Sequence, residues 1–279
     1  MKRGIVISDL QCGSIYGILP DQFVTGEDVH KPQNPGQAYL WACWIDYCNK
    51  AREFNPDFVV LNGDLVDGKQ QAQKGTELSL PLMDDQRRAA VECLTYTKNL
   101  LRPECKWYAV AGTVYHVGDG NEYEEAIARE MGCEPYKGAG TGRLCREILD
   151  LDVEGVIINF AHHISVNSGF YRATAADREG QWSAMTAKDQ SKGVPKADVV
   201  IRSHVHNFIH VEHASKHIIQ TPCWQLQTRF MRKHSAYRML PDIGGIFLEV
   251  DGDAKKRGED PLRLTKHLYS LPPAPVTKL

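Results

Sequence analysis

Five short segments, far apart in the sequence, carry acidic, histidine or amide side chains directly after a hydrophobic stretch. In chain order they contain Asp9 and Gln11, Asp64 and Asp67, Thr113 and His116, His162 and His163, and His204 and His206. Oxygen and imidazole ligands of this kind suit hard or borderline divalent metal ions. Two such ions, about 3.5–4 Å apart, can activate a water as hydroxide and bind both oxygens of a phosphoryl displacement. The residue types therefore predict a two-metal site.

The hydrophobic stretches before these segments have the length and composition of buried β-strands. They cover residues 4–8, 57–62, 107–111, 155–161 and 197–203. Open α/β sheets bind ligands in the crevice at the carboxyl ends of their strands, which is where the segments would lie. Asp64 could supply the negative charge that two neighbouring cations need between them. His204 and His206 are two residues apart, so they would share one face of a strand or reach different ions from the turn after it.

The remaining sequence alternates strands and helices in its first half and is rich in strands in its second half. Helical periodicity covers residues 37–54, 84–101 and 122–131, with Asn121 as the expected N-cap of the last helix. Further strands are expected at residues 143–149, 207–213, 217–220, 244–250 and 264–269, and a short helix at 180–192. This pattern predicts an α/β fold, a four-layer α-β-β-α sandwich of two mixed sheets flanked by helices.

The length of 279 residues fits one domain. We expect that domain to cover residues 1–270, with inserted loops near residues 13–36 and 167–195 and a loose, Pro-rich tail at 271–279. The first loop is long enough to cover a site.

The amino-acid composition argues against several classes of function. A formal net charge of −2 gives no overall basic field for nucleic acid or an anionic membrane. No apolar stretch is long enough to span a bilayer, and the first residues lack a signal peptide, so a cytoplasmic location is expected. None of the eight cysteines forms a Cys-x-x-Cys pair, which argues against a zinc knuckle. We expect buried free thiols, with Cys12 as the one that could be reactive because it lies beside the first segment.

The order and spacing of the five segments resemble the calcineurin-like metallophosphoesterase superfamily. Its pattern is Asp-x-His, Gly-Asp-x-x-Asp, Gly-Asn-His, a lone His, and Gly-His-x-His. The sequence Gly63-Asp64-Leu65-Val66-Asp67 and the pair His204 and His206 match well, and His162 matches the lone histidine. The resemblance implies a two-sheet sandwich that hydrolyses phosphate esters with two divalent ions, Mn²⁺ first, with Fe, Ni, Zn or Mg as alternatives.

Two positions depart from that pattern. Gln11 stands where the family has its first histidine, and a Gln carbonyl is a weaker donor to a transition ion than imidazole. Thr113 stands where the family has Asn, and His116 follows three residues later instead of immediately. A Gly-Thr-x-x-His segment resembles some phage and prophage members of the superfamily. The changes could weaken one metal site.

Carried over position by position, the resemblance implies a role for each residue. Asp9, Gln11 and His206 would bind the first ion, and Thr113, His162 and His204 the second, with Asp64 bridging both. His116 would protonate the leaving group, and Asp67 would orient His116 or a ligand. His163 remains an alternative to His162.

Other residues have simpler explanations. We expect His210, His213 and His217 to be strand and turn residues, and Arg143, Arg172, Arg178 and Arg229 to be surface residues rather than phosphate ligands. Residues 224–230 could line a substrate cleft or belong to the core. The functional alternatives are a phosphoesterase acting on mono- or diesters, nucleotides included, a weakened or inactive member acting as an interaction scaffold, and a DNA or RNA nuclease. The sequence does not indicate an oligomeric state.

Overall fold

The structure is a computed structural model. It describes residues 1–117, 121–135, 142–164, 171–235, 237, 240–273 and 277, without the side chains of residues 72, 234 and 235. No helix in these ranges is long and apolar enough to cross a membrane.

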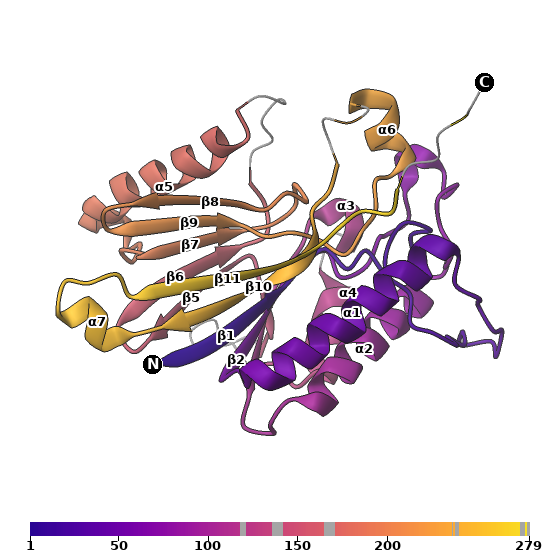
Figure 1. The fold of residues 1–279 in the computed structure, drawn as a ribbon, viewed down its shortest axis with the longest axis horizontal. Coiled ribbons are helices and arrows are strands. Elements are labelled where there is room, and N and C mark those ends of the chain that lie inside the picture. Colours follow the sequence, from indigo (N-terminus) through magenta and orange to yellow (C-terminus); the bar gives the residue numbers. More distant parts are fainter. Residues whose placement is uncertain are drawn as a thin grey trace.

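Two mixed β-sheets form the centre of the molecule (Figure 1). The first has the order β11-β10-β1-β2-β3-β4 and contains β1 (Lys2–Ile7), β2 (Phe58–Asn62), β3 (Lys106–Val110), β4 (Cys145–Arg146), β10 (Ile243–Val250) and β11 (Leu262–Tyr269). The second has the order β5-β6-β7-β9-β8 and contains β5 (Ile148–Val153), β6 (Val156–Ala161), β7 (Val199–Arg202), β8 (Ile209–His213) and β9 (Lys216–Gln220). Strands β1 to β3 are parallel, as are β6, β7 and β9, so the carboxyl ends of each set lie at one edge of their sheet.

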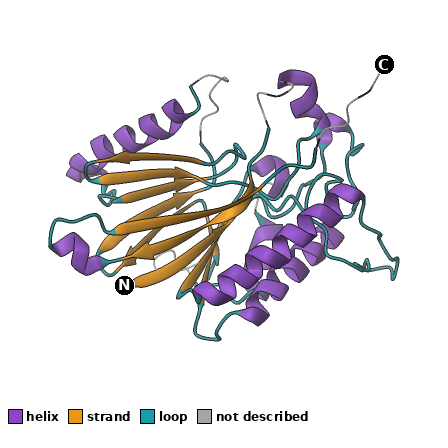
Figure 2. Ribbon diagram, in the orientation of Figure 1, coloured by secondary structure: helices purple, strands orange, loops and turns teal. Residues whose placement is uncertain are grey.

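Helices cover the outer face of each sheet (Figure 2). The longer ones are α1 (Pro35–Phe54), α2 (Met83–Leu100) and α4 (Glu122–Glu130) on the first sheet and α5 (Ala173–Lys188) on the second. Short helical segments are α3 (Val114–Val117), α6 (Arg229–Ser235), α7 (Gly252–Lys256), η1 (Gln71–Gln73) and η2 (Gln190–Lys192).

Alternation along the strands divides the core into layers, because successive strand side chains point to opposite faces. In β1, Ile5 and Ile7 pack with the helices α1 and α2, whereas Val6 packs between the two sheets. A third group, which includes Ala176 and Ile218, lies between α5 and the second sheet. The predicted four-layer α-β-β-α sandwich is confirmed.

The start of α1 is specified by its sequence. The Asn34 side chain accepts a hydrogen bond from the Gln37 backbone N–H at 3.0 Å, and the Gln37 side chain accepts one from the Asn34 N–H at 3.2 Å. Pro35 occupies the first helical position, where its missing N–H is not needed. The helix ends at Phe54, and its C-cap Asn55 is left-handed at φ 54° and precedes Pro56.

Three expectations about the elements were wrong, and two short helices were missed. Asn121 is not a side-chain cap, because its backbone is left-handed and its side chain accepts no capping hydrogen bond. The strand expected at 143–149 is split, with β4 in the first sheet and β5 in the second. The helix expected at 180–192 begins earlier, at Ala173, because its first turns contribute Ala175 and Ala176 to the packing under the sheet. The short helices α6 and α7 were not predicted.

The structure describes the first predicted insertion in full and the second in part. Residues 13–36 pack into the protein, with Ile18, Leu19 and Phe23 buried. Of the second insertion and the tail, residues 167–170, 274–276, 278 and 279 lie outside the described residues.

Candidate metal centre

The loops that follow β1 and β2 are joined side by side through their backbones. The N–H of Asp9 donates to the Gly63 carbonyl at 2.9 Å, the N–H of Gln11 to the Asp64 carbonyl at 3.1 Å, and the N–H of Cys12 to the Leu65 carbonyl at 3.1 Å. The parallel pairing of the two strands therefore continues past their ends. It brings the carboxylates of Asp9 and Asp64 into one small space.

Several of the candidate ligands have a left-handed backbone. The φ angles are 51° at Asp9, 49° at Gln11, 53° at Asp64, 75° at His204 and 59° at His206. Non-glycine residues rarely adopt this conformation, and it collects at functional sites where the surrounding structure enforces it. Here it turns each chain sharply at a strand end, so that side chains two positions apart enter the same space.

Two glycines allow the closest approach of these loops. A Cβ atom on Gly112 would lie 2.1 Å from Asp64 Oδ1, and one on Gly63 would lie 2.6 Å from His162 Nδ1. Any side chain at position 112 would therefore displace the Asp64 carboxylate. Gly63 and Gly112 are therefore needed at these positions, because a larger residue would not fit there.

Asp9 pairs with the histidines of the last segment. Its Oδ1 lies 3.2 Å from His206 Nε2, and its Oδ2 accepts the His204 backbone N–H at 3.5 Å. Both Asp9 and His206 are buried. The first and last predicted segments, almost 200 residues apart, thus meet directly.

Asp64 lies at the centre of the cluster. Its Oδ2 is 3.0 Å from His162 Nε2, 4.0 Å from His204 Nδ1 and 3.5 Å from Gln11 Nε2. Its Oδ1 accepts hydrogen bonds from the backbone N–H of Thr113 at 2.7 Å and from the Thr113 hydroxyl at 3.1 Å. One ligand atom from each of Asp64, His162 and His204 lies within 4.8 Å of the other two.

The buried charges of this cluster stabilise one another. Burial opposes the charged form of both His162 and Asp64, but each group favours the charge of the other. The pKa of His162 therefore rises to about 10, because the carboxylates of Asp64 and Asp9 outweigh its burial. The pKa of Asp64 falls well below its usual range, because His162 and His116 outweigh its burial. Positive charge is thus favoured in this space, whether it comes from a proton or from a metal ion.

His116 and Asp67 lie on one side of the cluster. His116 Nδ1 is 2.6 Å from the Asp67 backbone carbonyl, which leaves Nε2 directed at the centre, 3.7 Å from Asp64 Oδ2. The Asp67 carboxylate accepts hydrogen bonds from the side-chain amides of Gln70 and Gln225. Burial raises the pKa of Asp67 to about 6, although the nearby His116 opposes the rise.

Two supporting residues were not predicted from the sequence. Asn62, the last residue of β2, accepts a hydrogen bond from His162 Nδ1 at 2.7 Å through its backbone carbonyl, and its side chain donates to Ser203 Oγ at 2.6 Å. Glu124 on α4 accepts the backbone N–H of Leu65 at 3.1 Å and of Gly112 at 2.6 Å. Asn62 could have been noticed as a polar residue ending a buried strand. Glu124 gives no such signal, because it lies on a helix far from any motif.

The structure leaves other candidates outside the cluster. His163 is exposed, with its ring 4.7 Å from the His204 ring and tilted by 32° to it, whereas His162 is buried against Asp64. Trp224 belongs to the core, where its ring meets that of Trp44 at 4.7 Å. All eight cysteines, Cys12 included, are free and buried.

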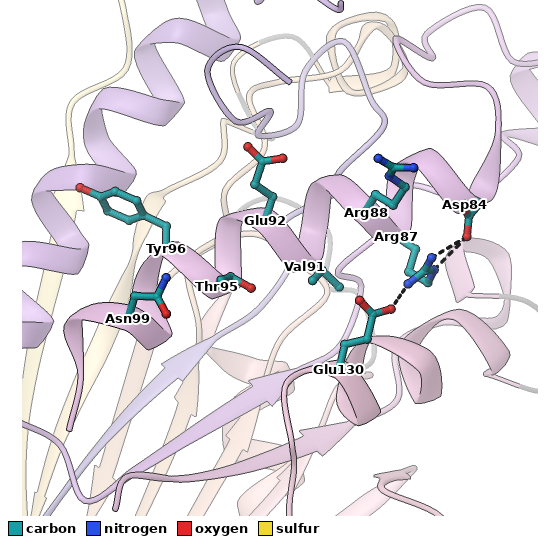
Figure 3. A pocket seen from close by; sticks show the side chains of 9 residues that line it. All are labelled: Asp84, Arg87, Arg88, Val91, Glu92, Thr95, Tyr96, Asn99 and Glu130. Atoms are coloured by element: carbon teal, nitrogen blue, oxygen red, sulfur yellow. Dashed lines mark hydrogen bonds and ion pairs between the residues drawn. The ribbon is translucent and has the colours of Figure 1, made fainter. Parts of the chain in front are cut away.

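A hollow along α2 is unrelated to the motifs (Figure 3). Its Arg87 is already paired with Asp84 at 2.7 Å and with Glu130. None of the five segments lines it.

The cluster fits divalent ions. Gln11 Oε1 and His162 Nε2 are buried without a hydrogen-bond partner, although Nε2 lies 3.0 Å from Asp64 Oδ2. Two ligand atoms at right angles on one ion, each about 2.1 Å from it, are about 3.0 Å apart. The contacts of 3.0 Å between His162 and Asp64 and 3.2 Å between His206 and Asp9 have this spacing. His162 also has the backbone hydrogen bond on its other ring nitrogen that usually orients a metal-binding histidine.

Three solved structures resemble this chain at low sequence identity. No protein-family model and no curated protein matches the chain. Among solved structures, Vacuolar Protein Sorting 29 from Cryptosporidium parvum matches with a TM-score of 0.42 and 10% identity over 97% of this chain and 98% of that one. A novel archaeal phosphodiesterase matches with a TM-score of 0.39 and 10% identity over 95% of this chain and 99% of the other. A predicted phosphoesterase from Streptococcus pneumoniae matches with a TM-score of 0.34 and 10% identity over 95% and 98%.

Two of these neighbours are named as a phosphodiesterase and a predicted phosphoesterase, and the third as a vacuolar sorting protein. At such low scores the likeness carries no weight for the activity of this chain. The activity has to be inferred from the site.

Proposed function

We propose that the chain is a metal-dependent phosphoesterase. The proposal depends on one observation above all: Asp9, Asp64, His162 and His206, from four distant segments, form one buried cluster with contacts of 3.0–3.8 Å. Buried carboxylates are costly unless they are paired or bind a metal. Alternating carboxylate and imidazole groups around one space form the kind of ligand set that divalent ions bind.

We assign the residues to two ions as the motif pattern implies. Asp9, Gln11 and His206 would hold one, and Thr113, His162 and His204 the other, with Asp64 between them. Mn²⁺ is the first choice, and Fe, Ni, Zn and Mg are the alternatives. When bound, such ions activate a water and offset the negative charge of a phosphate ester.

The protein itself would supply orientation and a proton. The Asp67 carbonyl fixes the His116 ring at 2.6 Å, so that Nε2 is directed at the cluster. From that position His116 would donate a proton to the leaving group of the ester. General acid catalysis of this kind contributes roughly 10²–10⁴-fold to a rate. Substrates in this class are phosphate mono- or diesters, including nucleotides and nucleic acid ends.

The test is a metal and substrate matrix. The purified protein would be analysed for bound metal and assayed with Mn²⁺, Ni²⁺, Fe²⁺ and Mg²⁺ against a chromogenic phosphomonoester and a chromogenic phosphodiester. We expect Asp64→Asn to lower turnover by at least about 100-fold, since even changes to supporting residues of metal sites cost 10–100-fold. Asp21→Asn, at an exposed turn, is the matched control and should keep full activity. Turnover that survives Asp64→Asn would disprove the proposal.

A second candidate is an interaction scaffold with a weakened metal centre. The observation in its favour is the Thr113 hydroxyl, which lies within hydrogen-bond distance of both Asp64 oxygens, at 3.1 and 3.2 Å. In a scaffold, Thr113 would donate a hydrogen bond to Asp64 and would not bind an ion. The same matrix separates the two candidates, because a scaffold gives no turnover with any of the metals.

A further inference from the structure

A second group of histidines and carboxylates lies on the β8–β9 hairpin, outside the metal centre described above. It consists of His210 and Glu212 on β8, His217 on β9 and Asp260 before β11. The sequence predicts these histidines as strand residues, which they are, but their side chains also converge. One ligand atom from each of His210, Glu212 and His217 lies within 4.8 Å of the other two.

The sheet geometry brings these side chains to one face. His210 and Glu212 are two residues apart on β8, and Glu212 lies directly opposite His217 in the antiparallel register. The alternate residues Val211 and Ile218 pack toward α5. The histidines therefore face away from α5, toward the segment that carries Asp260.

The contacts of His217 resemble the support of a metal-binding histidine. Its Nε2 lies 2.9 Å from Asp260 Oδ1, and that oxygen also accepts the Leu262 backbone N–H at 2.9 Å. An ionised carboxylate only accepts hydrogen bonds, so Nε2 carries the proton and Nδ1 keeps a free lone pair. A carboxylate that orients a histidine in this way is a common outer partner of a metal ligand.

The lone pair of His217 Nδ1 points at the other histidine. His210 Nε2 is 3.0 Å from it, and the two rings are nearly parallel, with an angle of 20° between their planes. A separation of 3.0 Å suits a hydrogen bond. Two nitrogens bound to one tetrahedral zinc ion at about 2.1 Å each lie about 3.4 Å apart, so the rings would have to separate by only about 0.4 Å to bind one. The nearby Glu212 carboxylate would be a third, negatively charged ligand. A histidine pair joined only by a hydrogen bond has no need of this carboxylate.

We propose that His210, Glu212 and His217 form a second, independent binding site for a borderline divalent cation of the zinc type. Two imidazoles and one carboxylate are a known zinc ligand set that leaves a position for water. The site lies toward the start of β9, whose first residues pair with the start of β7, whereas the metal centre lies beyond the end of β7. A bound ion would cross-link the edge strand β8 to β9. This proposal does not depend on the phosphoesterase proposal.

The test counts zinc ions. Wild-type protein would be titrated with Zn²⁺ alone, and bound metal measured by elemental analysis and calorimetry. We expect His210→Gln and Glu212→Gln each to lose one zinc ion per chain or to weaken that site at least tenfold. Asp260→Asn should weaken it about 10–100-fold, since Asp260 acts through His217. His213→Gln is the matched control, because His213 is a neighbouring histidine that pairs with Asp177 at 2.9 Å instead.

Loss of the proposed zinc site can be distinguished from loss of the first metal centre. Each of these variants should keep the metal bound by Asp9 and Asp64 and any phosphoesterase turnover with Mn²⁺. Glu212 is exposed, so its substitution should not disturb folding, and circular dichroism would check this. Equal zinc stoichiometry and affinity in wild type, His210→Gln and Glu212→Gln would overturn the proposal. So would an equal loss in His213→Gln.

Discussion

Glu124 should make the stability of the metal-free protein depend on pH in a defined direction. Its carboxylate is buried and accepts one backbone N–H from each of two loops of the metal centre. Burial, together with the nearby Asp64 carboxylate, raises the pKa of Glu124 from 4.5 to about 7, although the two N–H groups favour its ionised form. The folded protein therefore binds a proton at Glu124 more tightly than the unfolded chain does.

The size of the effect follows from that difference. A group with a raised pKa in the folded state contributes stability that is fully present below its unfolded pKa, here 4.5, and is lost as the pH rises through about 7. The whole difference is on the order of 3 kcal/mol, of which about 2.5 kcal/mol should disappear between pH 5 and pH 8. Glu124→Gln removes the ionisation, so the variant should lack this part of the pH dependence.

The assay is urea unfolding of both proteins in EDTA at pH 5, 6, 7 and 8. The quantity of interest is the free energy of unfolding of Glu124→Gln minus that of wild type at each pH. We expect this difference to increase by about 2–3 kcal/mol from pH 5 to pH 8. Glu53→Gln, which changes an exposed glutamate on α1, should give a constant difference.

A difference between Glu124→Gln and wild type that stays constant over this range would refute the reasoning. It would mean that the two backbone N–H groups compensate fully for the burial of the carboxylate. A pKa below 4.5 in the folded protein would also give a nearly constant difference, because Glu124 would then be largely ionised in both states above pH 5, and it would refute the reasoning equally.

Three further predictions concern the metal centre. Gly112→Ala should lower metal affinity and turnover at least tenfold, because the new Cβ would lie 2.1 Å from Asp64 Oδ1. The control Gly258→Ala, at a position with open space around it, should cost only about 1 kcal/mol of backbone strain and keep turnover. Equal metal affinity and turnover in the two variants would contradict the steric argument. Gln11→His should tighten the first ion, since imidazole is the better donor, and calorimetry showing no gain would place position 11 outside the coordination sphere. His116→Gln should slow esters with a poor leaving group, such as phenyl, by about 100-fold and nitrophenyl esters much less; equal slowing would exclude a role as proton donor.

The sequence identifies the segments of the metal centre well because their signals are local. A polar residue directly after a buried apolar strand is visible in the sequence, and parallel strands place such residues at one edge. Asp9, Asp64, His162 and His206 could be placed in this way. The structure confirms that these four side chains converge, and their assignment as ligands stays a prediction.

The remaining features depend on contacts between distant residues. Glu124 reaches the metal centre from a helix, and only the packing of α4 against β3 brings it to Gly112. The choice between His162 and His163 depends on which side of one turn faces Asn62. Asn121 has the residue type of a cap, yet its backbone is left-handed, which the residue type alone does not indicate.

The backbone hydrogen bonds between the loops after β1 and β2 affect how such a site can evolve. They join main-chain atoms of residues 9–12 and 63–65, and so they do not depend on which side chains these positions carry. A ligand can therefore be exchanged by a single codon change while the loops stay in place. A change of side chain at Gln11, for example, would leave the pairing of the two loops intact, so the ligand set can vary without a change of architecture.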